Sequence, residues 1–390
     1  MIESPYGVMA VLAGTAAFFF WLEKATGWKL FKYMVPLIWI YATPMVLRNV
    51  GVLPPASPAY DVLRYWGLPI FIVWLLLSVD VGAAIRIMGR GIGVMLLGTV
   101  GIMLGAPIGY LVVHRWLDDT AWSGFGALAG SWIGGTGNLA AAGAALNTPP
   151  DQFGLAVLAD TVIYIGWLPL LLGSKSFAEK FNRWTGVSKD RLAKMEAAAA
   201  AEHKEQKPPS TTDVLYLLAI GFGVTALAQW LAPQLPQIEL GGEVVISTGT
   251  WVVLLVTTMG ICLSFTPAKR ISSSHNIAMG VVYVFVARMG AVGSLEGLTQ
   301  APAFLVGAAI WILVHGAFCL FGAWLLKVDV HSAAIASAAN VGGAASAPVV
   351  AAHHRESLVP ASILMALLGY AMGNYLAILT GHMCRMIVGG

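Results

Sequence analysis

Two Gly-rich stretches decide how this chain folds: GSWIGGTGNLAAAGAAL at residues 130–146 and SAANVGGAASAPVVAAHH at residues 337–354. Both are apolar enough to enter a membrane, yet their glycines and asparagines make each a poor continuous helix. Irregular backbone is tolerated at membrane depth only where it is buried in protein or lines a watery cavity, because unpaired amides and carbonyls are costly in lipid. The two stretches therefore predict a cavity.

The composition predicts an all-α integral membrane protein. Of the 390 residues, 58% are hydrophobic and 11% are charged, and the mean hydropathy is +0.78, far from the values of soluble domains. Apolar runs long enough to cross a hydrocarbon core of about 30 Å recur along the chain. The predicted crossings are 8–22, 33–50, 67–85, 92–114, 153–173, 213–231, 244–264, 277–292, 301–326 and 358–379.

Charge and cysteine content exclude several other classes. The net charge of +3 comes mostly from residues between the apolar runs, so it argues against a nucleic-acid partner. The three cysteines fit no CxxC or zinc spacing, which argues against a structural metal.

The chain is predicted to contain two copies of one unit. An offset of 208 residues places Gly134-Gly135 on Gly342-Gly343 and Trp116-Leu117 on Trp324-Leu325. Such internal repeats often build transporters. We therefore divide the chain into a first repeat at 1–173, a polar cytoplasmic linker at 174–212 and a second repeat at 213–390.

Positive charges orient the predicted crossings, because short cytoplasmic loops are rich in Lys and Arg. Basic residues follow the first, third, seventh and ninth crossings, and the linker holds eight between Lys175 and Lys207. If residues 122–146 crossed the membrane, this linker would lie outside. We therefore predict that each repeat has five crossings and one re-entrant hairpin, which inverts one repeat relative to the other. A broken helix that crosses the membrane is the alternative.

The turns of the two hairpins are the candidate substrate site. Glycine permits unusual dihedral angles and close approach to a ligand. Freed amides and helix N-termini can hold an anionic group, and freed carbonyls can hold Na⁺. Close helix packing by small residues is the alternative role of such sequences. The candidate residues are Gly134, Gly135, Thr136, Gly137, Asn138, Asn340, Gly342, Gly343 and Ser346.

Asp160 is the main candidate outside the turns, because a carboxylate at membrane depth is costly and usually faces a cavity, an ion path or a partner. It is predicted to bind Na⁺, with Asn138, Asn340 and backbone carbonyls of the hairpins, or to carry a proton. A structural hydrogen bond to a neighbouring helix is the alternative. Asp80 and Arg288 hold matched positions in the two repeats, near helix ends. We expect one of three roles for them: pairing with each other, extension to the membrane surface, or contact with substrate.

The histidines are expected to have structural roles. His315 is expected to be a satisfied interior histidine, and His353-His354-Arg355 an interfacial cluster. The sequence has no P-loop, nucleophile elbow or HExxH motif, so we expect neither an ATP-driven pump nor an enzyme.

The paired motifs resemble those of the bacterial membrane protein family called domain of unknown function 819. More distantly, the chain is similar to the sodium-coupled glutamate and citrate carriers with GG-containing re-entrant loops. This resemblance implies a core domain that holds the hairpins, a scaffold domain that forms a homodimer, and elevator-type alternating access coupled to sodium. Among individual residues, the resemblance extends to Gly134, Gly135, Gly342 and Gly343, which match the GG pairs of those re-entrant loops. Neither turn has a basic residue, so a neutral, zwitterionic or peptide-like substrate fits at least as well as citrate.

These observations lead to one functional hypothesis with two rivals. The chain is predicted to be a multi-pass secondary active transporter of the bacterial inner (plasma) membrane. It would import a small polar metabolite (an amino acid, small peptide or organic acid) with Na⁺ as the coupling ion and no further cofactor. The first rival is a proton-coupled transporter or exchanger with Asp160 as the carrier. The second is a channel or holin-like pore.

Overall fold

Long apolar helices make up nearly all of the chain in the computed structural model. It describes residues 1–28, 30–31, 36–79, 82, 88–188, 208–240, 243–293 and 299–388. The first half contains α1 (Pro5–Thr26), α3 (Pro36–Asn49), α4 (Pro58–Val62), a π-helical turn (Leu63–Gly67), α5 (Leu68–Leu77), α7 (Arg90–Val113), α8 (Ala121–Gly134), α9 (Thr136–Ala145), α10 (Pro150–Gly173) and α11 (Ala178–Thr185).

The second half contains the same kinds of element in a similar order. Its helices are α13 (Thr211–Leu231), α14 (Thr248–Ser264), α15 (Ser274–Ala291), α16 (Ala301–Leu326), α17 (Val330–Asn340), α18 (Gly343–His354) and α19 (Val359–Val388). The strands β1 (Ile238–Leu240) and β2 (Glu243–Ile246) form a small antiparallel pair between α13 and α14. Short 3₁₀ turns cover His114–Trp116, Ser174–Phe177, Ala232–Gln234, Pro267–Arg270 and Glu356–Leu358.

The membrane character of the chain is confirmed, since seven helical segments of the described chain are long and apolar enough to span a bilayer. They are Pro5–Thr26, Pro58–Leu77, Arg90–Trp116, Pro150–Thr185, Thr211–Gln234, Ala301–Leu326 and Val359–Val388. The other three predicted crossings correspond to the shorter helices α3, α14 and α15.

Several predicted boundaries are wrong. The segment predicted as a helix from 244 begins as strand β2, because a β-branched run there pairs with β1, and α14 starts at Thr248. The third crossing begins at Pro58 rather than 67, and its predicted end overlaps residues 80–81 and 83–87, which lie outside the described residues. The first part of the predicted linker is helical, since it forms a 3₁₀ turn and α11 directly after α10. The Ala-rich part of the linker lies outside the described residues.

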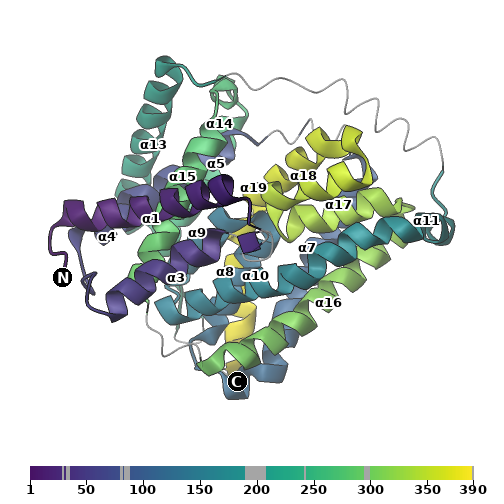
Figure 1. Cartoon of the computed structure of the whole chain (residues 1–390), viewed down its shortest axis with the longest axis horizontal. Helices are drawn as coiled ribbons and strands as arrows, with labels where there is room; N and C mark the ends of the chain where they lie inside the picture. Colours follow the sequence, from purple (N-terminus) through teal and green to yellow (C-terminus); the bar gives the residue numbers. More distant parts are fainter. Residues whose placement is uncertain are drawn as a thin grey trace.

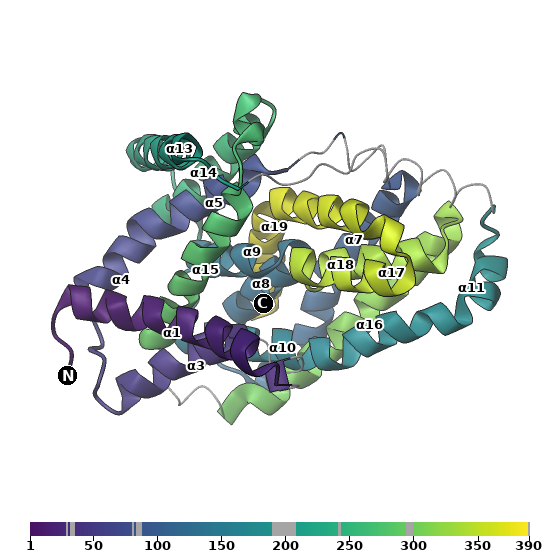
Figure 2. The same ribbon diagram turned by 45° about the horizontal axis from the view of Figure 1, so that its top comes forward.

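The helices form two groups that lie side by side in Figures 1 and 2. In the first, which we call the core, α7 packs on α16, α8 packs on α9 and α19, and α10, α17 and α18 join them. In the second, the scaffold, α3 and α5 pack on α15, with α1, α13 and α14 around them. Small residues bring helices close within the core: a Cβ atom placed on Gly126 of α8 would lie 2.9 Å from the Cα atom of Gly381 in α19.

Candidate functional site

Each Gly-rich stretch forms a helical hairpin whose two ends lie together. In hairpin 1 (α8 and α9), the Thr148 hydroxyl after the second helix donates to the Ser123 carbonyl in the first turn of α8 at 3.1 Å. In hairpin 2 (α17 and α18), the Nδ1 atoms of His331 and His354, at the two ends, are 3.0 Å apart. The chain therefore turns back on itself in both stretches, as the charge pattern predicts, and neither is one long broken helix.

The turns depend on glycine, and they meet. Gly135 has φ 78° and ψ −174°, a conformation that only glycine adopts without strain, and φ is 111° at Gly342 and 58° at Gly343. A Cβ atom placed on Gly343 would lie 3.4 Å from the Cα atom of Gly135. Tyr370 of α19 lies beside both turns, since its ring is 3.2 Å from a Cβ atom placed on Gly135. The hairpin tips are thus in contact.

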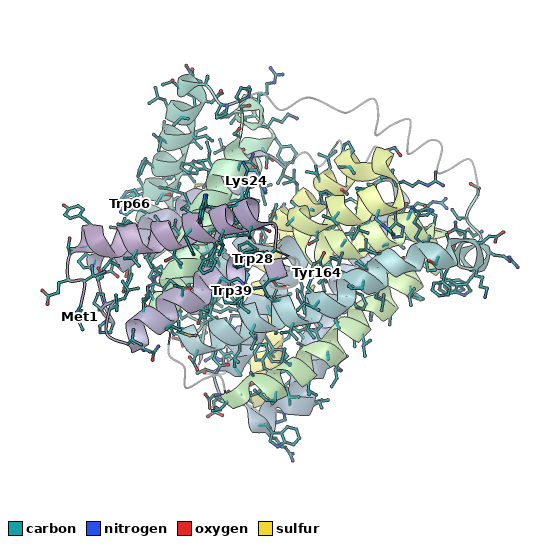
Figure 3. The ribbon with its side chains drawn as sticks, viewed as in Figure 1. Met1, Lys24, Trp28, Trp39, Trp66 and Tyr164 are labelled. Carbon is teal, nitrogen blue, oxygen red and sulfur yellow. The ribbon has the colours of Figure 1, made fainter. Side chains whose placement is uncertain are left out.

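A cavity of about 470 Å³ lies where the two turns face α10. Tyr164 projects from α10 in the middle of the molecule, near the end of α1 that carries Lys24 (Figure 3). The lining combines residues of the core with residues of the scaffold. It consists of Phe20, Glu23, Pro36, Leu37, Ser131, Gly135, Thr136, Asp160, Thr161, Tyr164, Ile165, Leu168, Pro169, Leu172, Tyr283, Gly342, Ala345 and Ser346.

The charge of this cavity is negative. Asp160 lies in the middle of α10, and its Oδ1 atom accepts a hydrogen bond of 3.0 Å from Nε1 of Trp132. Glu23, near the end of α1, supplies a second carboxylate to the lining. None of the described lining residues is a lysine, arginine or histidine. Uncompensated carboxylates in a partly desolvated cavity favour a cation or an ammonium group.

Neutral polar groups complete the site. Ser131, Thr136, Thr161 and Ser346 supply hydroxyl oxygens to the cavity wall. The first turns of α9 and α18 begin at the two hairpin turns, and their N-cap residues Gly135 and Gly342 have no side chain to cap them, although in α18 the Tyr370 hydroxyl accepts a hydrogen bond from the Ala344 amide. Uncapped helix N-termini present free amides to an anionic group. The cavity therefore combines oxygen atoms suited to a small cation with amides suited to a carboxylate.

The structure brings some of the predicted site residues to this cavity and places others elsewhere. Gly135, Thr136, Asp160, Gly342 and Ser346 line it. Gly134 packs against α19, where a Cβ atom would lie 2.7 Å from the carbonyl oxygen of Gly369. Gly343 lies at the contact between the tips, and Gly137 packs against Leu75 of α5.

The two hairpin asparagines hold the hairpins to neighbouring helices. Asn138 is buried, and its Nδ2 atom donates to the Tyr370 carbonyl at 3.0 Å and to Oδ1 of Asn374 at 2.9 Å. Asn340 is also buried, and its Nδ2 atom donates to the Thr99 hydroxyl at 2.9 Å. Neither asparagine lines the cavity. Their amide groups contribute to the position of the tips.

Sequence reasoning missed several lining residues that share a helix with predicted ones. Thr161 and Tyr164 follow Asp160 by one and four residues on α10, and Ser131 lies shortly before the first turn. The spacing of four places Tyr164 on the same helix face as Asp160, so helical periodicity could have found it. Nothing in the sequence connects Glu23 of α1 with this site, because α1 is brought there by its packing on α3 and α15.

The remaining candidates lie away from the cavity. Arg288 lies over the ring of Phe285 at 5.8 Å and donates to the Met289 sulfur at 3.0 Å, and Asp80 lies outside the described residues. His315 is a satisfied interior histidine, as expected, because its ring nitrogens lie 2.9 Å from the Gly98 carbonyl and 2.9 Å from the Ser337 hydroxyl.

The predicted interfacial cluster divides into an exposed and a buried part. His353 is exposed, and its carbonyl accepts a hydrogen bond of 2.6 Å from Nζ of Lys175. His354 is buried, and its Nε2 atom lies 2.9 Å from the Leu171 carbonyl. The His354 ring thus packs between α10 and α17, and the position of the cluster at the membrane interface stays a prediction.

The long apolar helices, with a cavity where two helical hairpins face α10, define a multi-pass integral membrane protein. The model of the family described as "Protein of unknown function (DUF819)" matches residues 10–387, and the chain belongs to this family. The chain is also similar to the "Uncharacterized membrane protein YjcL" of Bacillus subtilis (strain 168), with 26% identity over 352 residues that cover 87% of each protein.

Proposed function

We propose that this protein is a secondary active transporter, a Na⁺-coupled symporter that imports a small polar metabolite by alternating access. The observation that carries the proposal is the cavity of about 470 Å³ in which the touching hairpin turns face the carboxylate of Asp160. A transporter needs such a central site between parts that can move relative to each other, and discontinuous helices typically form it.

Contacts between loops support an inverted arrangement of the two repeats. One set of loops meets at one end of the molecule: the backbone amide of Asp118 donates to Oε1 of Gln300 at 3.0 Å, and Arg48 donates to the Gly293 carbonyl at 3.1 Å. The loop 293–300 has no lysine or arginine. By the charge rule, this end faces outward. Hairpin 1 starts directly after Asp118, so it enters from outside.

A second set of loops meets at the opposite end. Arg90 donates to the Leu326 carbonyl at 3.3 Å, and the Val330 amide donates to Oδ1 of Asn182 at 3.0 Å. These loops include the start of the basic linker, with Lys175, Lys180 and Arg183, and Lys327, so the charge rule assigns them to the cytoplasm. Hairpin 2 starts at Val330, so it enters from the cytoplasmic side.

The cavity extends from the tips toward the cytoplasm. Glu23 and Leu172 line it, and they lie near the ends of α1 and α10 that the charge rule assigns to the cytoplasmic face. In our proposal the structure is thus an inward-facing state. Alternating access would follow from movement of the core along the scaffold, with the scaffold of two copies forming a homodimer.

The chemistry of the lining favours one class of cargo. The Asp160 carboxylate and neighbouring hydroxyls provide the oxygen ligands of a Na⁺ ion. The N-terminus of α9, which begins at the lining residue Thr136 and has no side-chain cap, fits a substrate carboxylate. Because the described lining has no cationic side chain, we propose a neutral or zwitterionic substrate, such as an amino acid or small peptide, in preference to an organic acid.

Thermal stability of the purified protein tests the ion. A ligand that binds only the folded state at a hundredfold excess over its Kd stabilises it by about 2.7 kcal/mol. We expect a higher Tm in Na⁺ than in K⁺ or choline at equal ionic strength, and loss of this difference in Asp160→Asn. Asp151→Asn, in the first turn of the same helix, should retain it. Equal Tm values across these salts would refute sodium binding.

A proton-coupled transporter is the second candidate, because Asp160 is a carboxylate inside the core that accepts a hydrogen bond from the neutral Trp132. Such a carboxylate can exchange a proton as the site opens to either side. A pH-dependent Tm that is lost in Asp160→Asn, together with no response to Na⁺, would favour this candidate. Flux that neither saturates nor accumulates substrate would favour a channel instead.

A further inference from the structure

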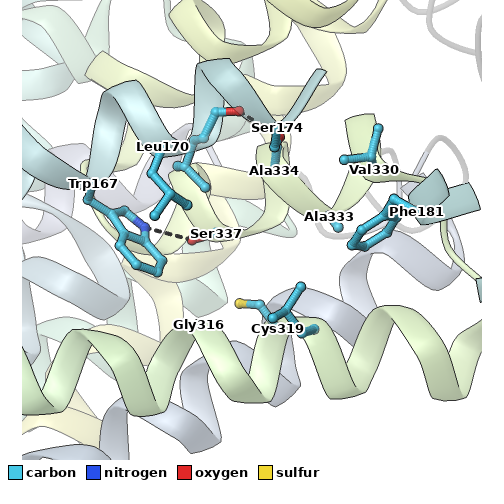
Figure 4. A pocket seen from close by; sticks show the side chains of 12 residues that line it. Trp167, Leu170, Ser174, Phe181, Gly316, Cys319, Val330, Ala333, Ala334 and Ser337 are labelled. Atoms are coloured by element: carbon cyan, nitrogen blue, oxygen red, sulfur yellow. Dashed lines mark hydrogen bonds between the residues drawn. The ribbon is translucent and has the colours of Figure 1, made fainter. Parts of the chain in front are cut away.

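A second pocket, of about 120 Å³, lies at the base of hairpin 2, apart from the candidate site (Figure 4). Helices α10, α16 and α17 form its walls, with Trp167, Cys319 and Ala334 among the lining residues, and Phe181 of α11 closes one end. Its most polar contact is already satisfied, since Nε1 of Trp167 donates to the Ser337 hydroxyl at 3.0 Å. Water therefore gains little by entering this pocket, because a buried water needs several polar partners.

The pocket opens sideways from the core. Leu170 on α10 and Leu320 on α16 line it, and 56% and 50% of these side chains are exposed. Both helices belong to segments that can span a bilayer, so these exposed side chains face hydrocarbon. Lipid chains fill a void that is open to hydrocarbon, because the atoms that line an empty space make no dispersion contacts across it.

Helix α11 gives the cytoplasmic end of the pocket the character of a membrane interface. Phe181 turns into the pocket, while Phe177 and Trp184 are exposed. Lys180 and Arg183, on the same short segment, are exposed as well. Aromatic rings beside basic residues are typical of the lipid headgroup level, and clustered cations there attract anionic lipids.

We propose that an acyl chain of an anionic phospholipid from the cytoplasmic leaflet occupies this pocket, with its phosphate at Lys180 and Arg183. The lipid would hold hairpin 2 in place, because α17 forms one wall and Asn182 of α11 accepts a hydrogen bond of 3.0 Å from the Val330 amide. The inference rests on the membrane character of the chain and on its orientation, and it does not depend on sodium coupling or on the substrate.

Lipid-dependent thermal stability tests the proposal on the full chain, delipidated in detergent. We expect dioleoyl phosphatidylglycerol to raise the Tm by several degrees more than dioleoyl phosphatidylcholine, which has the same chains. Inorganic phosphate alone should have no such effect. Lys180→Gln/Arg183→Gln should reduce the phosphatidylglycerol shift to the phosphatidylcholine level. Lys269→Gln/Arg270→Gln, an exposed basic pair in another loop assigned to the cytoplasm, should retain the full difference.

Filling the pocket tests the position of the chain. Ala334→Phe should remove most of the shift produced by either lipid, whereas Leu313→Phe, at a position of α16 where the native side chain is 66% exposed, should not. Should Ala334→Phe fail to fold, wild-type protein is photolabelled with a phosphatidylglycerol that carries a diazirine on its acyl chain. Labelling of Leu170 and Leu320 should be competed by unlabelled phosphatidylglycerol more than by phosphatidylcholine. Equal stabilisation by the two lipids, an unchanged shift in the charge variant, or equal competition would overturn the proposal.

Discussion

The two hairpins share a Gly-Gly turn but differ in how firmly the protein holds them. Hairpin 1 is buried over almost its whole length, and Asn138 ties it to α19 with two hydrogen bonds. In hairpin 2, α17 is buried, but α18 leaves Val349 and His353 exposed. Asn340 donates one hydrogen bond, and its buried Oδ1 atom has no partner among the described residues. The difference predicts that hairpin 1 is held more firmly than hairpin 2.

Replacing the two asparagines should show the largest difference between the hairpins. Asn138→Leu leaves the buried Oδ1 atom of Asn374 without its donor and removes the second hydrogen bond to the Tyr370 carbonyl, so we expect a loss of about 3 kcal/mol in unfolding free energy. Asn340→Leu removes one hydrogen bond together with an unpartnered oxygen, and should cost about 1 kcal/mol or less. Thermal or denaturant unfolding in detergent measures both, and equal losses would contradict the comparison.

Alanine in the turns should show a smaller contrast. Gly135→Ala forces alanine into a glycine-only conformation with its Cβ atom 3.2 Å from the Tyr370 ring, so we expect a loss of about 2 kcal/mol. At Gly343, φ of 58° costs alanine about 1 kcal/mol. Gly166→Ala on α10 is the control, because a Cβ atom there would meet no atom within 4 Å. A reversed ranking of the two turn variants, measured as a change in Tm, would show that hairpin 1 is not the more constrained.

The smallest predicted effect is at the base of hairpin 2. Asn182→Ala removes the acceptor for the Val330 amide at the start of α17, which should cost about 1 kcal/mol, as for other capping contacts. Hydrogen exchange in α17 and α18 should become faster, while exchange in hairpin 1 stays unchanged. Lys180→Ala, an exposed change on the same short helix, is the control for exchange in detergent without added lipid. Faster exchange in both hairpins would indicate general destabilisation instead of a local release.

The sequence was sufficient to predict the hairpins, because their signals are local. Glycines at Gly134-Gly135 and Gly342-Gly343 interrupt apolar segments. For the basic linker to be cytoplasmic, the chain must enter and leave the membrane by the same face in these stretches. Asp160 was also identifiable, since an isolated carboxylate in an apolar run is too costly to keep unless it faces a cavity, an ion path or a partner.

The direction of side chains around each helix could not be predicted. Helices such as α8 and α17 are buried on all sides, so the hydrophobic pattern does not reveal which face meets the cavity. That is why Asn138 was grouped with Thr136, although the first faces α19 and the second faces the cavity. The β-branched run at 244–246 has the same ambiguity, because an apolar run fits a strand as well as a helix end.

The most direct test of the account is the accessibility of residue 136, which lies in the turn of hairpin 1 and lines the cavity. Thr136→Cys is introduced with Cys262→Ala, which removes the exposed native thiol, and a membrane-impermeant maleimide is applied to either face of sealed vesicles. We predict labelling from the cytoplasmic face in K⁺, a Na⁺-dependent change in the ratio of labelling from the two faces, and loss of this change in Asp160→Asn. Labelling from one face only, at the same rate with and without Na⁺, would contradict sodium-coupled alternating access.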